Sequence, residues 1–315
     1  MTPLVEADRL SRDFAVGSWP FAKAPVRAVC DVSLEVGRGE AVGLVGESGS
    51  GKSTVGRLLL GLLPASGGSV KFDGVELARV PAAGLRRRMQ LVFQDPYGSL
   101  DPRRRIGTQI ADSLQIHRVV PADMRARRVV ELLEQVGLAG EHARRFPHEF
   151  SGGQRQRIGI ARALASEPDF LVADEPVSAL DVSVQAQILR LLADLRTRLG
   201  LAMLFISHDL PVVRHLCDRV VVMYLGRVME EGAVAAVFET PRHPYTRALL
   251  SAAPSLTPGR KARILLLGEP PSPADPPSGC VFRTRCAHVL PACADVIPTL
   301  RGARHRVACI RDDLD

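Results

Sequence analysis

A glycine-rich loop early in the chain has the composition and spacing of a phosphate-binding site. It follows an apolar run over residues 41–45 and leads into a segment with helical periodicity. Its glycines let successive backbone N–H groups point at phosphate oxygens, and the start of a helix adds a partial positive charge. The full spacing in this context predicts a P-loop rather than a chance glycine-rich turn. The residues that we expect to bind a nucleotide are Gly46, Glu47, Ser48, Gly49, Ser50, Gly51, Lys52, Ser53 and Thr54.

Two adjacent acids follow a second apolar run, at residues 170–173. They are Asp174 and Glu175. At the end of a buried strand, one carboxylate can hold Mg²⁺ while the next aligns and deprotonates a water for attack on a γ-phosphate. We expect Asp174 and Ser53 to be Mg²⁺ ligands, Glu175 to be the general base, and Lys52 to reach the β- and γ-phosphates. The alternative is that the two acids simply lie in solvent at the end of a strand. A P-loop in the same chain makes this alternative less favourable.

A third motif combines a helix cap with glycines. Ser151 precedes Gly152, Gly153 and Gln154 at the start of a helical segment. Serine is a favoured N-cap residue, and the exposed backbone donors of the following glycines make a second anion site.

Four cysteines crowd the last 36 residues of the chain. Their spacing, C-x5-C-x6-C-x15-C, lacks the tight C-x2–4-C pairs of structural zinc sites, so a bulkier iron–sulfur cluster is favoured. Zinc and four free thiols remain alternatives. The expected ligands are Cys280, Cys286, Cys293 and Cys309, whereas Cys30 and Cys217 stand alone in apolar contexts.

Composition limits the class of protein. The chain has 315 residues, 46% of them hydrophobic, and a net charge of +7. No apolar run approaches the roughly 18 residues of a membrane helix, and residues 1–10 have no apolar core of a signal peptide, so we expect a cytoplasmic protein. The arginine clusters have no interleaved aromatic residues, which argues only weakly for nucleic acid.

Apolar runs alternate with helical segments through the first part of the chain. Runs at 41–45, 89–93, 170–173, 201–206 and 220–223 predict buried strands, and 53–63, 154–164 and 182–199 predict helices. This alternation predicts an α/β fold with a mostly parallel sheet, and the P-loop makes it a P-loop NTPase. We expect a domain over 1–253, with an inserted helical subdomain at about 95–165. Prolines from 254 onward predict a linker and a small cysteine-rich extension over 254–315.

Together these motifs resemble the ATP-binding cassette (ABC) ATPases. Gln94 after the run 89–93 resembles the Q-loop, Asp181 the D-loop, and His208 the switch histidine, while Phe150 replaces the usual leucine before the signature serine. The resemblance covers about residues 4–235. It implies that two such domains sandwich two ATP molecules, each between one subunit's P-loop and the other's signature motif. A non-hydrolysing regulatory cassette is disfavoured because both Glu175 and His208 are present.

The resemblance also assigns further ligands. It implies that Gln94 completes the Mg²⁺ ligands and, with His208 and Glu175, belongs to the catalytic set. An aromatic residue near the end of the first strand stacks on adenine in this family. Phe14 fits best by position, and Trp19 and Phe21 are alternatives.

Several segments resemble the dipeptide, oligopeptide and nickel importers more specifically. They are residues 94–103, 150–158, 241–250, 268–273 and 279–286, and 174–187 is closest to the second of two paired ATPase subunits. The resemblance implies a partner ATPase in a heterodimer, two membrane permease subunits, an extracytoplasmic binding protein acting indirectly, and no nucleic acid. It places the chain at the cytoplasmic face of the membrane, with peptides as cargo, or nickel as the alternative. Some members carry a 4Fe–4S cluster at matching cysteines. A soluble cassette ATPase acting on DNA or ribosomes is less favoured, because this chain has one cassette and the importer tail.

Overall fold

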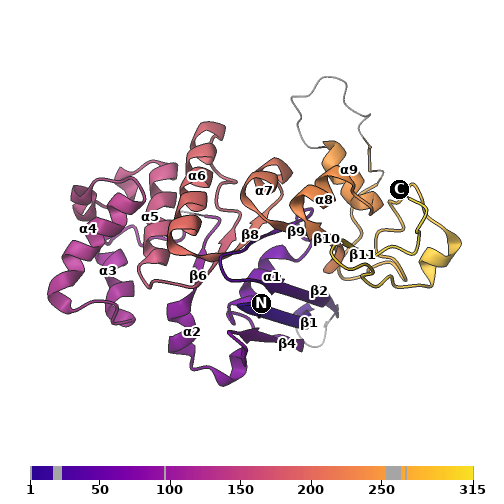
Figure 1. The fold of residues 1–315 in the computed structure, drawn as a ribbon, viewed down its shortest axis with the longest axis horizontal. Coiled ribbons are helices and arrows are strands. Elements are labelled where there is room, and N and C mark those ends of the chain that lie inside the picture. Colours follow the sequence, from indigo (N-terminus) through magenta and orange to yellow (C-terminus); the bar gives the residue numbers. More distant parts are fainter. Residues whose placement is uncertain (1, 17–22, 96, 253–263, 267, 315) are drawn as a thin grey trace. The chain divides into compact units, whose positions relative to one another are not determined.

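The structure, a computed structural model, describes residues 2–16, 23–95, 97–252, 264–266 and 268–314 (Figure 1). The chain divides into two compact units. One comprises residues 5–35, 41–74 and 206–315 and is called the P-loop unit. The other comprises residues 1–4, 36–40 and 75–205 and is called the carboxylate unit, because Asp174 and Glu175 lie in it.

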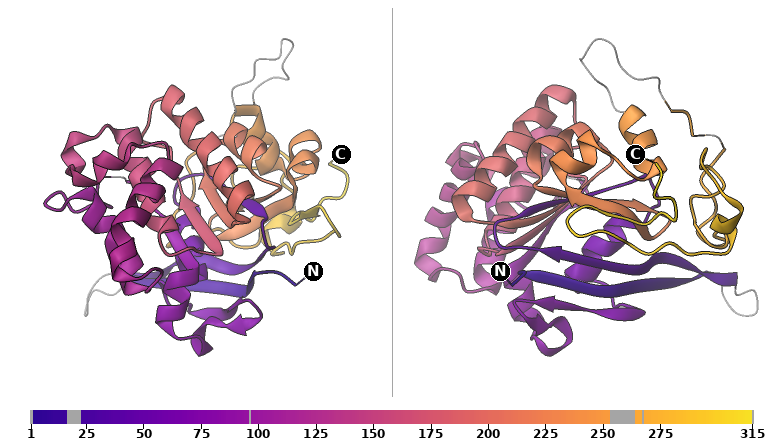
Figure 2. Two further views of the ribbon diagram at one scale, coloured as in Figure 1. Left: turned by 60° about the vertical axis from the view of Figure 1, so that its left-hand side comes forward. Right: turned by 45° about the vertical axis from the view of Figure 1, so that its right-hand side comes forward.

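Two sheets form the P-loop unit. In the first, β1 (Val5–Val16) lies between β2 (Lys23–Val36) and β4 (Gly67–Phe72), and β1 pairs antiparallel with β4. The long strands β1 and β2 run side by side in Figure 2. In the second, β3 (Ala41–Val45) is parallel to β9 (Arg219–Tyr224), and the antiparallel strands β10 (Arg227–Ala233) and β11 (Arg306–Val307) continue the sheet.

The helices of the P-loop unit are short. They are α1 (Lys52–Leu59), α7 (Leu210–Leu216), α8 (Val234–Glu239), α9 (Pro244–Ala252) and the 3-10 turn η5 (Pro291–Ala294). The helix predicted over 53–63 ends at Leu59. Gly61 adopts a left-handed φ of 61°, and the N–H of Leu62 bonds back to the carbonyl of Arg57 at 2.8 Å, which closes the helix in the manner of a C-terminal cap.

In the carboxylate unit, β6 (Met89–Val92) is parallel to β7 (Phe170–Asp174), which neighbours β8 (Ala202–Ser207). The segment between β6 and β7 is mainly helical, as the grouped helices in Figure 1 show. The remaining elements of this unit are β5 (Val75–Glu76), η1 (Leu77–Arg79), α2 (Ala82–Arg88), α3 (Ile106–Ile116), η2 (Ala122–Met124), α4 (Arg125–Gln135), η3 (Gly140–Arg144), η4 (Pro147–Glu149), α5 (Gly152–Leu164) and α6 (Val182–Leu199).

The predicted strands are confirmed to within one or two residues at each end. Every residue of β3, β7 and β8 is buried, as expected for strands of a sheet covered on both faces. Helix α6 has the predicted bounds. Among the described residues, no helix combines the length and apolar character needed to cross a membrane.

Candidate functional site: a P-loop, a carboxylate pair and a capped glycine motif

The P-loop connects β3 to α1, and its shape depends on glycine. Gly46, Gly49 and Gly51 have φ angles of 153°, 78° and 98°. A Cβ on Gly46 would lie 2.1 Å from the carbonyl oxygen of Met223, and one on Gly51 would lie 2.2 Å from that of Ala28. Larger residues therefore cannot replace these two glycines without moving the backbone.

Lys52 is held across the loop that precedes it. Its side chain is only 5% exposed, and Nζ donates hydrogen bonds to the carbonyl oxygens of Gly46 and Glu47, both at 2.9 Å. The ammonium thus lies within the curve of the loop. Ser53 and Thr54 are half-buried in the first turn of α1. A cation beside a helix N-terminus makes an anion site.

The two acids at the end of β7 lie in different environments. Asp174 is 6% exposed, whereas Glu175 is half-buried and has a left-handed φ of 45°. Such a conformation costs about 1–3 kcal/mol in a non-glycine residue and commonly marks functional positions. The Gln94 amide Nε2 donates to Glu175 Oε2 at 3.1 Å and to Ser178 Oγ at 3.4 Å. The structure therefore brings Gln94 and Glu175 together within the carboxylate unit, and Ser178, which begins the segment that resembles the D-loop, lies with them.

The glycine motif starts helix α5 as predicted. Ser151 is the N-cap, and its hydroxyl accepts the N–H of Gln154 at 3.3 Å, while Gln154 Oε1 accepts the N–H of Ser151 at 3.0 Å. Gly153 allows close packing, because an added Cβ would lie 2.3 Å from a methyl of Val184.

Asp181 has a local structural role in addition to the predicted D-loop assignment. It is the N-cap of α6 and accepts the N–H of Val184 at 3.0 Å. The Ser183 hydroxyl, which donates to it at 2.7 Å, lowers the pKa of this carboxyl, with help from the backbone bond.

The remaining nucleotide-site candidates lie in the P-loop unit. His208 is exposed directly after β8, and the next residue, Asp209, is the N-cap of α7. Phe14 is half-buried on β1, and the guanidinium of Arg12 lies 4.8 Å from the centre of its ring. The alternatives Trp19 and Phe21 lie outside the described residues.

The four C-terminal cysteines line one small cavity. Burial raises the pKa of Cys280 to about 11 and also raises that of Cys286. The backbone N–H groups of His288 and Leu290 donate to the sulfurs of Cys286 and Cys293, both at 3.4 Å. Within the described ranges, no group of three or more His, Cys, Asp or Glu side chains is arranged as a site for a single metal ion.

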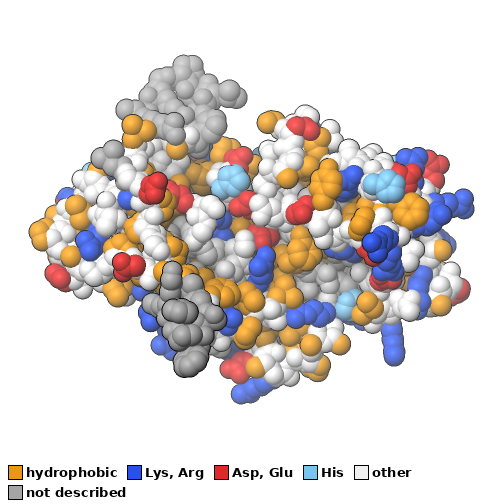
Figure 3. Space-filling model, turned by 180° about the vertical axis from the view of Figure 1, so that it is seen from behind, with side chains coloured by type: hydrophobic (Ala, Val, Ile, Leu, Met, Phe, Trp, Pro, Cys, Tyr) orange, Lys and Arg blue, Asp and Glu red, His pale blue; other side chains and the backbone are white. Residues whose placement is uncertain are grey.

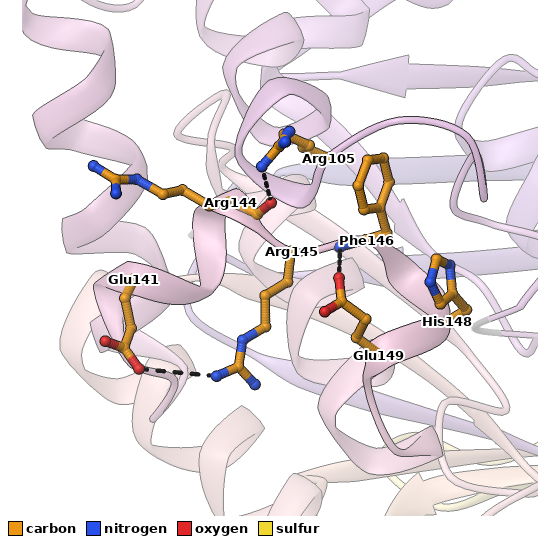
Figure 4. Close-up of a pocket in the computed structure, with 7 residues that line it drawn as sticks. All are labelled: Arg105, Glu141, Arg144, Arg145, Phe146, His148 and Glu149. Atoms are coloured by element: carbon orange, nitrogen blue, oxygen red, sulfur yellow. Dashed lines mark hydrogen bonds and ion pairs between the residues drawn. The ribbon is translucent and has the colours of Figure 1, made fainter.

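A separate open pocket of about 600 Å³ lies in the carboxylate unit, and its lining is shown in Figure 4. Arg105 donates to the carbonyl of Arg144, and Arg145 lies 3.9 Å from Glu141. Elsewhere, on the face shown in Figure 3, Lys and Arg side chains lie interspersed with acidic and apolar ones.

Comparison with known proteins decides the family. The chain is 53% identical over 319 residues to a putative peptide import ATP-binding protein of Brucella ovis, covering 99% of each chain. It is 51% identical over 312 residues to one of Brucella abortus, covering 97% of this chain and 93% of that one. The chain belongs to the ATP-binding proteins of ABC transporters. The family described as ABC transporter matches residues 29–178, and the oligopeptide/dipeptide transporter C-terminal region matches residues 229–293.

Solved structures of ABC proteins are also similar to this one. A dimeric ATP-binding cassette in a post-hydrolysis state, bound to ADP and phosphate, matches with a TM-score of 0.64 and 28% identity, covering 73% of this chain and 98% of that one. The cbiO1 protein of Clostridium perfringens, part of an ABC transporter complex, matches with a TM-score of 0.65 and 28% identity, covering 76% and 92%. This ABC protein is therefore an ATPase with the α/β P-loop NTPase fold.

Proposed function

We propose that this ABC ATPase powers the import of di- or oligopeptides from the cytoplasmic face of the membrane. The observation that carries the proposal is the full-length similarity to peptide import ATP-binding proteins, which includes the C-terminal extension as well as the cassette. Uptake of nickel or another small solute is the alternative, because the ATPase does not itself select the cargo.

The residues of the two units support a division of chemical roles. Lys52 and the loop amides bind the phosphates of ATP, and Phe14 stacks on the adenine. Glu175 takes a proton from a water that Gln94 helps to hold, as the water attacks the γ-phosphorus and ADP leaves. His208 stabilises the transferred phosphoryl group. Bound Mg²⁺ would neutralise phosphate charge, and Ser53, Gln94 and Asp174 supply the oxygen ligands that suit it.

The signature residues act on the ATP of a second subunit. Ser151, Gly152, Gly153 and Gln154 present a capped helix start, which favours the γ-phosphate of a nucleotide bound by the partner. The partner is a paired ATPase in a heterodimer, with Asp181 at the interface. Two permease subunits complete the complex, and an extracytoplasmic binding protein delivers the cargo.

The segment after Gln94 is the proposed docking surface for a cytoplasmic helix of a permease. Pro96 lies outside the described residues, but Tyr97 is 64% exposed and Arg105 leads into the pocket of Figure 4. Gln94 bonds to Glu175 and directly precedes this segment. A movement of Gln94 during hydrolysis would therefore be passed along the chain to the docking surface. The surface belongs to the proposed helical subdomain at about 95–165. Cysteine pairs placed at 97–105 and in a permease cytoplasmic loop should crosslink, and failure across the whole segment contradicts the assignment.

The C-terminal cysteines are the proposed ligands of a 4Fe–4S cluster. The residues fit this group because all four line one cavity and two sulfurs accept backbone N–H groups. A bound cluster would tie the loops of the extension together in place of an apolar core. Anaerobic purification with iron, sulfide and zinc analysis tests the assignment. A colourless protein with stoichiometric zinc would mean that the cysteines bind zinc instead of a cluster. A protein without metal contradicts both the cluster and the zinc assignment.

An uptake experiment separates the two cargo proposals. Cells that lack this ATPase should lose uptake of labelled di- or oligopeptides, and the wild-type protein should restore it. The Glu175→Gln variant should not. Loss of nickel uptake with intact peptide uptake supports the alternative cargo instead.

A further inference from the structure

One residue of the P-loop is bound by helix α9 and by the C-terminal extension. The backbone N–H of Glu47 donates to the hydroxyl of Tyr245 at 2.9 Å, and Arg285 Nη1 donates to the Glu47 carboxylate at 2.8 Å. Tyr245 and Arg285 are 198 and 238 residues away in sequence, and all three belong to the P-loop unit. Helix α9 thus holds the backbone of Glu47, and the extension holds its side chain.

The two anchors are themselves fixed by buried packing. Tyr245 is fully buried, with its ring centre 4.8 Å from that of Tyr224 and 5.3 Å from that of Phe282. Arg285 has a side chain only 7% exposed and lies against Tyr224, to whose hydroxyl it also donates at 3.4 Å. Burial raises the pKa of Tyr245 above its usual value, so its hydroxyl remains neutral and can accept the loop N–H.

These contacts act on the part of the P-loop that holds Lys52. Lys52 Nζ donates to the carbonyls of Gly46 and Glu47 and to the Ser50 hydroxyl. The N–H of Glu47, which shares a peptide group with the Gly46 carbonyl, points to Tyr245. A shift of residue 47 therefore moves an acceptor of the phosphate-binding cation. Fixing a loop in its binding conformation before the ligand arrives increases affinity by reducing the cost of ordering it.

Arg285 has a second role, which is to neutralise the charge of Glu47. A carboxylate in a loop that binds a polyphosphate repels the ligand unless a cation neutralises it. Arg285 is that cation, and because the pair is largely buried, removal of one partner leaves the other charge uncompensated.

We propose that Tyr245 and Arg285 are positioning residues for ATP binding, so that helix α9 and the C-terminal extension form part of the nucleotide site. The proposal rests on the assignment of the P-loop as the ATP site. The turn with Arg285 is flanked by Cys280 and Cys286, so the cysteine-bearing extension acts on ATP through residue 47.

The test is ATP binding by the full chain, measured by calorimetry, with the KM and kcat of the assembled transporter. Tyr245→Phe keeps the buried ring and removes the hydroxyl, and it should weaken ATP binding about 2- to 10-fold. Arg285→Gln should weaken it about tenfold or more. Both should raise the KM for ATP and leave kcat near wild type, because neither residue belongs to the carboxylate unit.

A matched control and a double variant make the test specific. Arg283→Gln, in the same turn, removes a bond to the carbonyl of Ser278 and should bind ATP as wild type does. Adding Glu47→Gln to Arg285→Gln should recover part of the lost affinity, because the uncompensated carboxylate is removed. If the losses of ATP affinity caused by Glu47→Gln and Arg285→Gln simply add in the double variant, the electrostatic role of Arg285 is wrong.

The experiments distinguish a failure of the P-loop assignment from a failure of the positioning role. If Lys52→Ala also leaves the ATP dissociation constant unchanged, the P-loop assignment itself is wrong. If Lys52→Ala weakens ATP binding while Tyr245→Phe and Arg285→Gln match Arg283→Gln, only the positioning role is wrong. A loss of kcat with an unchanged KM also contradicts it.

Discussion

The P-loop and the cysteine-bearing extension are built in opposite ways. The P-loop spans a few residues between a buried strand and a helix, and its lysine is held by neighbouring carbonyls. In the described part of the extension after residue 263, regular structure is limited to η5 and β11. Its cysteines meet through loops and a few buried side chains, such as Phe282. A site of the first kind depends on local geometry, and one of the second kind depends on long-range packing.

Because the nucleotide site depends on local geometry, its variants should change ATP hydrolysis more than the free energy of unfolding. Glu175→Gln should retain ATP and lose hydrolysis about 10²- to 10⁴-fold, because it removes the proposed general base. The measurement is ATP turnover of the assembled transporter, which should accumulate as a closed dimer. Glu167→Gln is the control, because Glu167 also has a left-handed φ, of 54°, and pairs with Arg128. Wild-type-like turnover of Glu175→Gln would falsify its role.

Variants of the extension should change stability. Phe282 is 1% exposed among Tyr224 and Tyr245, and Phe282→Ala should lower the free energy of unfolding by about 3–5 kcal/mol. Denaturant unfolding of the full chain measures this. Val289→Ala, at a position that is 49% exposed, should stay within about 0.5 kcal/mol of wild type. Equal effects of the two variants would mean that the extension does not depend on this packing.

Lys52→Ala tests the P-loop as a binding element. Loss of a charged hydrogen bond to phosphate should weaken ATP binding about 10- to 100-fold. Calorimetry with the full chain measures the dissociation constant, and an unchanged value counts decisively against the assignment.

The smallest expected effect concerns Ser151, and it distinguishes a role as helix cap from a role in binding nucleotide. Ser151→Ala removes the N-cap of α5 and should cost about 1 kcal/mol, whereas Ser151→Gly should cost only a few tenths. Hydrolysis in the assembled transporter should fall for both, because both remove the hydroxyl. If activity follows stability instead, Ser151 acts only as a cap.

The sequence was most informative where function and local structure coincide. The strands β3 and β7, the P-loop and the capped start of α5 were predicted because each has a short-range signal of periodicity or spacing. The partners of Glu47 could not be predicted, because Tyr245 and Arg285 approach it only through the folded sheet. The one available signal was their place within segments 241–250 and 279–286, which resemble the importer extension. The pairing of β1 with β4 was not predicted either, since it joins distant segments.

Strand β11 has a consequence for the solubility of the protein. Its two residues cover the outer edge of β10, and the N–H of the next residue, Ala308, bonds to the carbonyl of Met229 at 2.8 Å. The same segment brings His305 within 2.6 Å of the fully buried Glu230. A chain shortened before residue 300 would expose a row of unpaired backbone groups and remove the histidine partner of that carboxylate. Uncovered sheet edges are templates for association between chains. The end of the chain therefore protects the sheet from aggregation, independently of any group that the cysteines bind.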